Sequence, residues 1–406
     1  MLQGGLGPLV EREFRALFLS VTISALGDAV ATIALAFAIL DLGSLTDLGI
    51  VIASRQVASS AAVLIGGVYG DRLPRDRVMV VIALVQAATQ AATAAIVLGG
   101  SAALALVVPL QMAFGLADGF VQPVQTGIVP EVVSAERLQQ ANALMQTFRS
   151  GTWTVGPALG GILVAFGSPG VALAIDAASF LIAAALLSRL HLTVRSAISG
   201  SAGFRTELRE GFRAFRATDW VWMSAIGFGV GNLATQSLMV LGPALSKRHY
   251  GGPGAWASTS TAFSVGMIIG GLVAMRVRPS RPFAACIVGS AFFGVQMVAY
   301  GLLAPLWVLV AAAAIAGVGL AIHLSLWFTV FQQEIAAEMQ SRVSSFENLG
   351  SFVLNPIGTA LAGPLAVTLG VTTTLVAGGA IAFAADAVLL LLPSVWAIQR
   401  VGGLAK

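Results

Sequence analysis

The sequence predicts an all-α integral membrane protein, with twelve transmembrane helices in two pseudo-symmetric six-helix bundles. Three observations support this fold class. Of the 406 residues, 57% are hydrophobic and only 10% are charged. Uncharged stretches of about 18 residues or more, the length that a membrane-spanning helix needs, recur along the chain. The second half of the chain also repeats short motifs of the first half in the same order.

The apolar stretches are expected to be helices, because lipid offers the backbone no hydrogen-bond partner and a helix satisfies its own. The shortest stretch begins at Val171, and Leu190 and His191 can extend it. In chain order, the expected spans are Phe14–Leu40, Leu48–Gly70, Val78–Leu98, Ala103–Ile128, Ala141–Phe166, Val171–Leu187, Val221–Leu245, Ala257–Met275, Phe283–Leu303, Leu306–Phe331, Val343–Leu369 and Thr373–Leu392.

The basic residues indicate how these spans are oriented. An even number of spans places both termini on one side, and cytoplasmic loops carry an excess of Lys and Arg. With the N terminus inside, eighteen of the 22 basic residues are cytoplasmic and only Lys247 and Arg248 lie outside. The preference for arginine over lysine is associated with GC-rich bacterial genomes. We therefore expect a bacterial cell (inner) membrane protein with both termini in the cytoplasm.

Missing motifs exclude several other classes of protein. The net charge of +4 lies in short loops, which indicates membrane orientation and no nucleic-acid binding. Neither Lys247 nor Lys406 belongs to a phosphate-binding Gly-Lys-Ser/Thr loop, so ATP hydrolysis is not expected. None of the histidines begins a His-Glu-x-x-His zinc motif, and Cys286 is the only cysteine. The sequence predicts no enzyme, no cofactor and no metal site.

The longest hydrophilic break divides the chain into two expected bundles, 1–190 and 220–406, joined by a cytoplasmic linker, 191–219. The motif at Gly66–Arg72 returns at Gly270–Arg276, at an offset of 204 residues. Further repeats, at similar offsets, are Gly115-Leu-Ala with Gly319-Leu-Ala, Gly156–Gly161 with Gly358–Gly363, and Asp176 with Asp386. The linker spaces Phe204, Leu208, Phe212 and Phe215 as one helix face, which predicts an amphipathic helix on the inner membrane surface.

Two motifs carry a resemblance to a known family. The pattern Gly67-x-x-x-Asp71-Arg72-x-x-Arg75-x-Arg77 resembles the loop signature of the major facilitator superfamily, from which Pro74 and Asp76 depart. A second pattern is similar to the antiporter motif of proton-driven drug exporters and comprises Gly151, Gly156, Pro157, Gly160 and Gly161. The segments LGD, VPEVV, ANAL and DAASF look like the branch that holds macrolide-efflux proteins and the enterobactin exporter.

The resemblance implies roles for both motifs. Asp71 and the basic residues after it would latch the two bundles at the cytoplasmic side, and Arg75 would pair with Glu131. The alternative is that the arginines only orient the spans, which leaves Asp71 unexplained. In the second motif, small residues about one turn apart allow close helix approach and Pro157 invites a bend. In an exporter, that helix would close the interface and prevent substrate from leaking through it. The alternative is that the glycines serve only helix packing.

Ionisable side chains are costly within the membrane, so those expected there are functional candidates. Asp28 and Arg55 share one depth, and Asp118 and Arg149 share another. Asp28 lies midway along a helix that lines the cavity in the family, where a carboxylate can carry a proton from one face to the other. The alternative is a fixed ion pair with Arg55. A structural pair is the favoured interpretation for Asp118 and Arg149, because an unpaired buried charge is expensive. Asp176 and Asp386 lie on helices that pack outside the cavity in the family, and their repetition suggests a packing or hydrogen-bonding role.

The expected substrate cavity has few polar side chains among many apolar ones, which suits a lipophilic ligand. Its polar candidates are Gln111, Gln122, Asn232, Gln236, His323 and Trp327. For His323, partners within the helix bundle are an alternative to a role in transport. We expect a monomeric, proton-coupled secondary transporter that exports a drug, an antibiotic or a secondary metabolite by alternating access. An importer, or a lipid or siderophore transporter of the same fold, stays open as the alternative.

Overall fold

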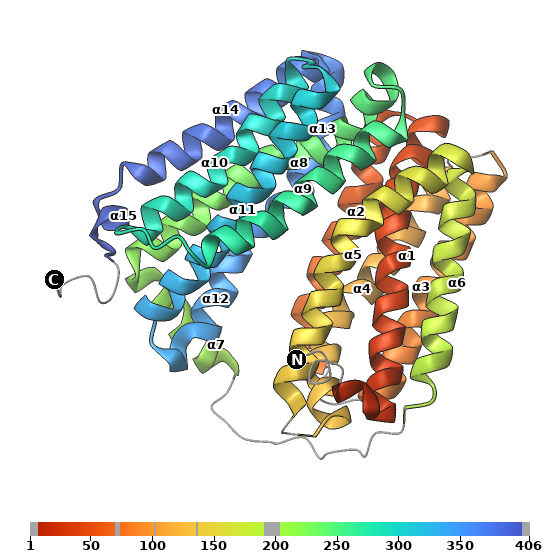
Figure 1. Cartoon of the computed structure of the whole chain (residues 1–406), viewed down its shortest axis with the longest axis horizontal. Helices are drawn as coiled ribbons and strands as arrows, with labels where there is room; N and C mark the ends of the chain where they lie inside the picture. The colour runs from red at the N-terminus through yellow and green to blue at the C-terminus, as the bar shows by residue number, and fades with distance from the viewer. Residues whose placement is uncertain (1–6, 70–73, 101–102, 135–136, 191–203, 400–406) are drawn as a thin grey trace. The chain divides into compact units, whose positions relative to one another are not determined.

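The computed structural model describes residues 7–69, 74–100, 103–134, 137–190 and 204–399, and within these the elements are helices and no strands. The all-α class is therefore confirmed (Figure 1). After a short 3-10 turn, Gly7–Val10, the helices are α1 (Arg12–Leu42), α2 (Leu45–Tyr69), α3 (Arg75–Leu98), α4 (Leu104–Val132), α5 (Leu138–Phe166), α6 (Pro169–Leu187), α7 (Phe204–Ala217), α8 (Asp219–His249), α9 (Pro253–Ala274), α10 (Pro282–Gly301), α11 (Leu306–Glu334), α12 (Ala337–Phe352), α13 (Asn355–Leu369), α14 (Val371–Leu390) and α15 (Pro393–Ala397).

The helices reproduce the expected spans closely. Ten spans in the described part of the chain are long and apolar enough to cross a membrane, and Val155–Ala165 of α5 forms a shorter apolar helix. The expected segment 48–70 falls on α2, where side chains are described only up to residue 62. The chain starts and stops helices with ordinary signals: Ser168 caps α6 by accepting from the Val171 amide, and Gly370 turns the chain into α14 at a φ of 89°.

The expected span Val343–Leu369 is confirmed as long and apolar enough to cross a membrane, but it is not one continuous helix. It consists of α12 and α13, which are separated at Val353 and Leu354. The physical reason is Pro356 in the first turn of α13, because a proline has no amide hydrogen and cannot donate a hydrogen bond to the preceding turn of a helix. Beside the break, the Asn232 Nδ2 of α8 donates to the Ser351 carbonyl oxygen at 2.9 Å. The hydropathy of this segment gives no sign of the interruption.

The expected linker helix is present as α7. Its Phe212 and Phe215 rings contact the Phe346 ring of α12, with centroid distances of 5.5 and 6.0 Å. On the other side of the helix, Arg209, Arg213 and Arg216 are exposed. The aromatic face of α7 is thus partly used against α12, although Phe212 remains about half exposed.

The chain divides into two compact units, of which the first comprises Met1–Ser199 with Gly252–Ala257 and the second comprises Gly200–Gly251 with Ser258–Lys406. Within the first unit, α1 packs against α5 and α6, α3 against α4 and α6, and α2 against α4. Within the second unit, α8 packs against α12, α13 and α14, α10 against α11 and α14, and α9 against α11. The same neighbour relations therefore occur in both units, as the repeated motifs indicate.

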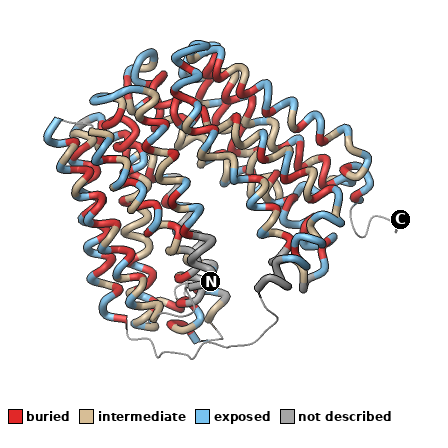
Figure 2. The backbone as a smooth tube through the Cα atoms, turned by 180° about the vertical axis from the view of Figure 1, so that it is seen from behind, coloured by how far each residue is buried: buried red, intermediate tan, exposed pale blue. Residues whose placement is uncertain are grey.

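Each unit has its own hydrophobic core. In the first unit the core includes Phe14, Leu17, Ile128 and Leu187. In the second unit it is aromatic, with Trp220, Phe283, Trp327 and Phe331 in edge-to-face or tilted contacts. Buried positions run along the helices of both units (Figure 2). Outward-facing positions are also apolar in many helices, which is expected where the surroundings are lipid.

Candidate functional site

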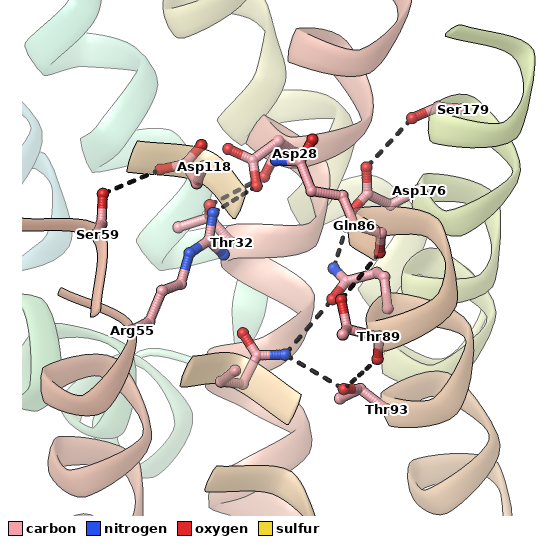
Figure 3. A network of polar contacts seen from close by, with 12 residues as sticks. Asp28, Thr32, Arg55, Ser59, Gln86, Thr89, Thr93, Asp118, Asp176 and Ser179 are labelled. Atoms are coloured by element: carbon pink, nitrogen blue, oxygen red, sulfur yellow. Dashed lines mark hydrogen bonds and ion pairs between the residues drawn. The ribbon is translucent and has the colours of Figure 1, made fainter. Parts of the chain in front are cut away.

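The first unit contains an ion pair at the membrane-embedded position that the sequence indicates. Arg55 of α2 donates from Nη2 to Asp28 Oδ1 of α1 at 2.7 Å (Figure 3). The side chain of Asp28 is 34% exposed and that of Arg55 is 18% exposed. The carboxylate is therefore both paired and partly accessible. Both interpretations of Asp28, a fixed partner of Arg55 and a proton carrier, are compatible with this geometry.

Arg55 is held from the other side by α4. Its guanidinium carbon lies 4.1 Å from the centroid of the Phe114 ring, a cation–π contact. The next residue, Gly115, lies directly against the Arg55 backbone, so that a Cβ atom there would overlap the Arg55 carbonyl oxygen. Gly115 belongs to the first copy of the repeated Gly-Leu-Ala motif. Because it has no side chain, α4 can approach α2 closely at the ion pair.

Asp118, one turn further along α4, also belongs to this region. Its Oδ2 is 3.5 Å from the Ser59 hydroxyl of α2, and its charge acts on Arg55 electrostatically. The expected partner Arg149 lies on α5, and its side chain is outside the described residues. The Asp118–Arg149 pair therefore stays a prediction. Asp118 is close enough to Arg55 to be part of the same charged site.

The antiporter motif on α5 contacts α1 beside the ion pair. A Cβ on Gly156 would overlap the Ala29 side chain, and one on Gly160 would lie 3.1 Å from the Ile33 side chain. Pro157 lies inside the helix, whereas a Cβ on Gly151 would meet none of the described atoms within 4 Å. Within the motif, Gly156 and Gly160 therefore account for the close packing of α5 on α1. The proposed seal against leak, which would also involve Gly161, stays a prediction.

A buried polar network lies behind α1 and was largely missed by sequence reasoning. Gln90 Nε2 of α3 donates to Asp176 Oδ2 of α6 at 2.7 Å, and Gln111 Nε2 of α4 donates to the Thr93 hydroxyl at 3.2 Å. Gln111 was expected in the substrate cavity, but it is completely buried. This placement is corrected: the helix buries Gln111 because Gln90 and Thr93 supply hydrogen-bonding partners for its amide nitrogen. Gln122 lies on α4, and its side chain is outside the described residues.

Two cavity candidates of the second unit are partly exposed on α8. Asn232 donates to the Ser351 carbonyl oxygen beside the break between α12 and α13. The Gln236 Oε1 accepts from the Thr359 hydroxyl of α13 at 3.2 Å. Both side chains therefore connect α8 to the interrupted helix. A role in substrate contact remains open to them because neither is fully buried.

The other two candidates of this unit are in its interior. Trp327 is 6% exposed and lies in the aromatic core, in contact with Trp220, Phe228 and Phe331. His323 is 9% exposed, and its Nδ1 lies 3.1 Å from the Cys286 carbonyl oxygen. The expectation that these two line the cavity is corrected, because aromatic packing and a backbone acceptor account for them. A ring nitrogen that donates to a helix carbonyl is the ordinary way to satisfy a buried histidine.

The loop motif between Gly67 and Arg77 lies only partly within the described residues. The ion pair expected between Arg75 and Glu131 is present, with 2.5 Å from Nη1 to Oε1 between the start of α3 and the end of α4. Gly67 lies in α2 and Arg77 is exposed on α3, whereas Asp71 and Arg72 are outside the described residues. Among the residues described, no group of three or more His, Cys, Asp or Glu side chains could hold a metal ion.

The chain is similar in sequence to two proteins that carry the name of an efflux protein. Macrolide efflux protein A of Streptococcus pyogenes is 24% identical over 314 residues, which cover 75% of this chain and 77% of that protein. The protein of the same name from Enterococcus faecalis is 23% identical over 298 residues, which cover 72% of this chain and 92% of the relative.

Solved transporters share the fold at low sequence identity. The chain is similar to a bacterial homolog of the human lysosomal transporter Spinster in an inward-facing, unoccupied conformation, with a TM-score of 0.73, 14% identity and coverage of 96% and 98% of the two chains. A bacterial homologue of the iron transporter ferroportin, also inward-facing, gives a TM-score of 0.72 at 16% identity, with 94% and 98% covered. The family description of the Major Facilitator Superfamily matches residues 17–359. The chain therefore belongs to the Major Facilitator Superfamily and is a membrane transporter, not an enzyme.

Proposed function

We propose that this protein is a proton-coupled exporter of small lipophilic compounds, with macrolide antibiotics as the first class to test. The observation that carries the proposal is the Asp28–Arg55 ion pair: a partly exposed carboxylate within the membrane, paired with a single guanidinium. The name of the relatives from S. pyogenes and E. faecalis supports efflux and suggests macrolides. The cavity that the sequence predicts has few polar side chains and would favour a lipophilic substrate.

The ion pair offers a simple coupling mechanism. When Asp28 is ionised it accepts the hydrogen bond of Arg55 at 2.7 Å. A proton on the carboxyl removes its charge and weakens this attraction, which frees both side chains to change partners. A bound drug that carries a positive charge or donates a hydrogen bond favours the ionised carboxylate. Proton and drug then compete, and each lowers the affinity of the other reciprocally, which is sufficient for exchange.

Proton–drug exchange across a membrane also requires a defined orientation and access from both sides. We infer an inner-membrane monomer with cytoplasmic termini, in which 1–190 and 220–406 open alternately to the two sides. The Arg75–Glu131 pair and the residues from Gly67 to Arg77 would close the cytoplasmic side. The charged residues of that motif suit reversible closure, because polar groups at helix ends can form one set of contacts in one state and release them in the other.

Accumulation of a radiolabelled macrolide, erythromycin, in cells that express the protein tests the proposal. Expressing cells are expected to accumulate less erythromycin than cells with an empty vector, and a protonophore should remove the difference because it dissipates the proton gradient. Equal accumulation with and without protonophore would contradict proton coupling. Higher accumulation in the expressing cells would contradict export and favour the importer alternative.

A further inference from the structure

A second carboxylate, that of Asp176 on α6, lies near the Asp28–Arg55 ion pair (Figure 3). Its side chain is completely buried, within a helix of membrane-spanning length. None of the described ion pairs includes it. An ionised carboxylate in such a place is expensive unless hydrogen bonds and nearby charges compensate for the lost water.

The hydrogen bonds of Asp176 suit both of its protonation states. Gln90 Nε2 donates to Oδ2 at 2.7 Å, and the Ser179 hydroxyl lies 3.3 Å from Oδ1. An ionised carboxylate accepts both bonds. A protonated one still accepts from Gln90, while its own hydroxyl donates to Ser179, because a serine hydroxyl can act as donor or acceptor. The site therefore does not force one state, and a proton can come and go without loss of these partners.

Asp176 contacts α1 at the residue that precedes Asp28. A Cβ on Gly27 would overlap both the Asp176 Oδ1 and the Ser179 hydroxyl oxygen, so only glycine lets the carboxyl approach the helix this closely. The charges of Asp28 and Arg55 both act on Asp176. Two carboxyl groups thus lie on either side of the same turn of α1, one partly exposed and one buried.

The charges that face Asp176 do not balance. From α1 it faces Asp28 and from α2 it faces Arg55, while α3 contributes the neutral amide of Gln90. Asp118 of α4 acts on the same Arg55. Among the described side chains whose charges act on Asp176, the one guanidinium of Arg55 therefore stands against two carboxyl groups, those of Asp28 and of Asp176 itself. A bound proton relieves the excess negative charge, and closely spaced carboxyl groups then take up their protons in coupled steps.

We propose that Asp176 is a second proton-binding group of the coupling site, whose proton occupancy depends on the charge of the neighbouring Asp28. The proposal rests on the proposed function in that Asp28 is taken as the coupling carboxylate. It adds a place where a proton resides while Asp28 is ionised and paired with Arg55. Gln90 and Ser179 are then positioning residues, which hold the Asp176 carboxyl against α1.

The second unit offers a matched control. Asp386 of α14 is the repeat counterpart of Asp176, is 8% exposed, and accepts from the Ser290 hydroxyl of α10 at 2.8 Å. At the sequence offset of 204, Gly27-Asp28 corresponds to Gly231-Asn232 and Arg55 to Thr259, so neither Asp28 nor Arg55 has an ionisable counterpart in the second unit. Asp386 shares the burial and the type of partner of Asp176, but it lacks the proposed coupling.

Infrared difference spectroscopy of the purified full-length protein, titrated with protons alone, tests the pair. Asp176→Asn identifies the carboxyl band of Asp176, since asparagine keeps its shape and its acceptor for Gln90, and Asp386→Asn identifies that of Asp386. Should Asp176→Asn not fold, Asp176→Ser removes the carboxyl and still offers an acceptor to Gln90. In Asp28→Asn, we expect the midpoint of the Asp176 band to move by about one pH unit or more towards acidic pH, because a neighbouring negative charge is lost. The Asp386 midpoint should not move.

An Asp176 band with the same midpoint in the wild type and in Asp28→Asn would overturn the proposal, as would an Asp176 carboxyl that does not titrate. Equal shifts of Asp176 and Asp386 would also overturn it, because the effect would then be global. These outcomes are independent of transport. Uphill export that persists in Asp28→Asn would contradict the proposed function, whereas the spectroscopic midpoints would still report whether the two carboxyl groups are coupled.

Discussion

Asp28→Asn is expected to abolish uphill, proton-driven export while the protein remains folded. Asparagine mimics the protonated carboxyl in size and can still accept from Arg55, but it cannot release a proton. In the wild type, proton and drug should weaken each other's binding by about 5- to 150-fold, the usual range of coupling between two ligands, and this dependence should disappear in the variant. Erythromycin accumulation at several external pH values measures both effects. Asp28→Glu should retain part of the activity.

Asp47→Asn is the matched control for this substitution. Asp47 lies in the first turn of α2, where it accepts from the Ser44 amide at 2.8 Å, a contact that asparagine can preserve. Export should be unchanged in this variant. Proton-dependent export against a gradient by Asp28→Asn would show that Asp28 is only a structural partner of Arg55. Asp118, which acts on the same guanidinium, would then become the next candidate.

Gly115→Ala is expected to destabilise the protein and to disturb the ion pair, although it adds a single methyl group. The new Cβ would overlap the Arg55 carbonyl oxygen, and a backbone atom cannot swing away as a flexible side chain can. Overpacking of this kind typically costs about 1–3 kcal/mol. The displaced helix α2 would carry Arg55 away from Asp28, so export should fall together with stability. Thermal unfolding in detergent and erythromycin accumulation measure the two effects.

Gly271→Ala provides the comparison for this prediction. Gly271 is also inside a helix, α9, but a Cβ there would meet no atom of the described residues within 4 Å. Its thermal stability should equal or slightly exceed that of the wild type, since alanine is the better helix former. An unfolding temperature of Gly115→Ala equal to that of Gly271→Ala would contradict the assignment of Gly115 as the close-contact point between α4 and α2.

Much of this architecture could be predicted from the sequence because membrane insertion depends on simple quantities. Uncharged length locates the helices, and the scarcity of intramembrane charge makes each charged residue conspicuous. Asp28 and Arg55 could be matched by depth alone, whereas the pairing of Arg75 with Glu131 was implied by the resemblance to the superfamily. The glycine motif of α5 indicated close helix approach, which the structure shows for Gly156 and Gly160 against α1.

The rest could not be predicted because a helix in lipid is apolar on all sides. Periodicity then does not distinguish the face towards a cavity from the face towards a core, which is why Trp327, His323 and Gln111 were misplaced. The break between α12 and α13 is hidden within a continuous apolar stretch, where Pro356 was the one local sign. The Gln90–Asp176 bond joins residues 86 positions apart, a pairing that only the packing of α3 on α6 brings about.

Proton movement across liposomes that contain the purified protein tests the central claim most directly. A pH-sensitive dye is enclosed in the vesicles, and a gradient of erythromycin is imposed without any initial pH gradient. The account predicts that erythromycin moving down its gradient drives protons in the opposite direction in the wild type, and that Asp28→Asn shows no such proton flux. Erythromycin movement without proton flux, or with protons moving in the same direction, would contradict proton–drug exchange.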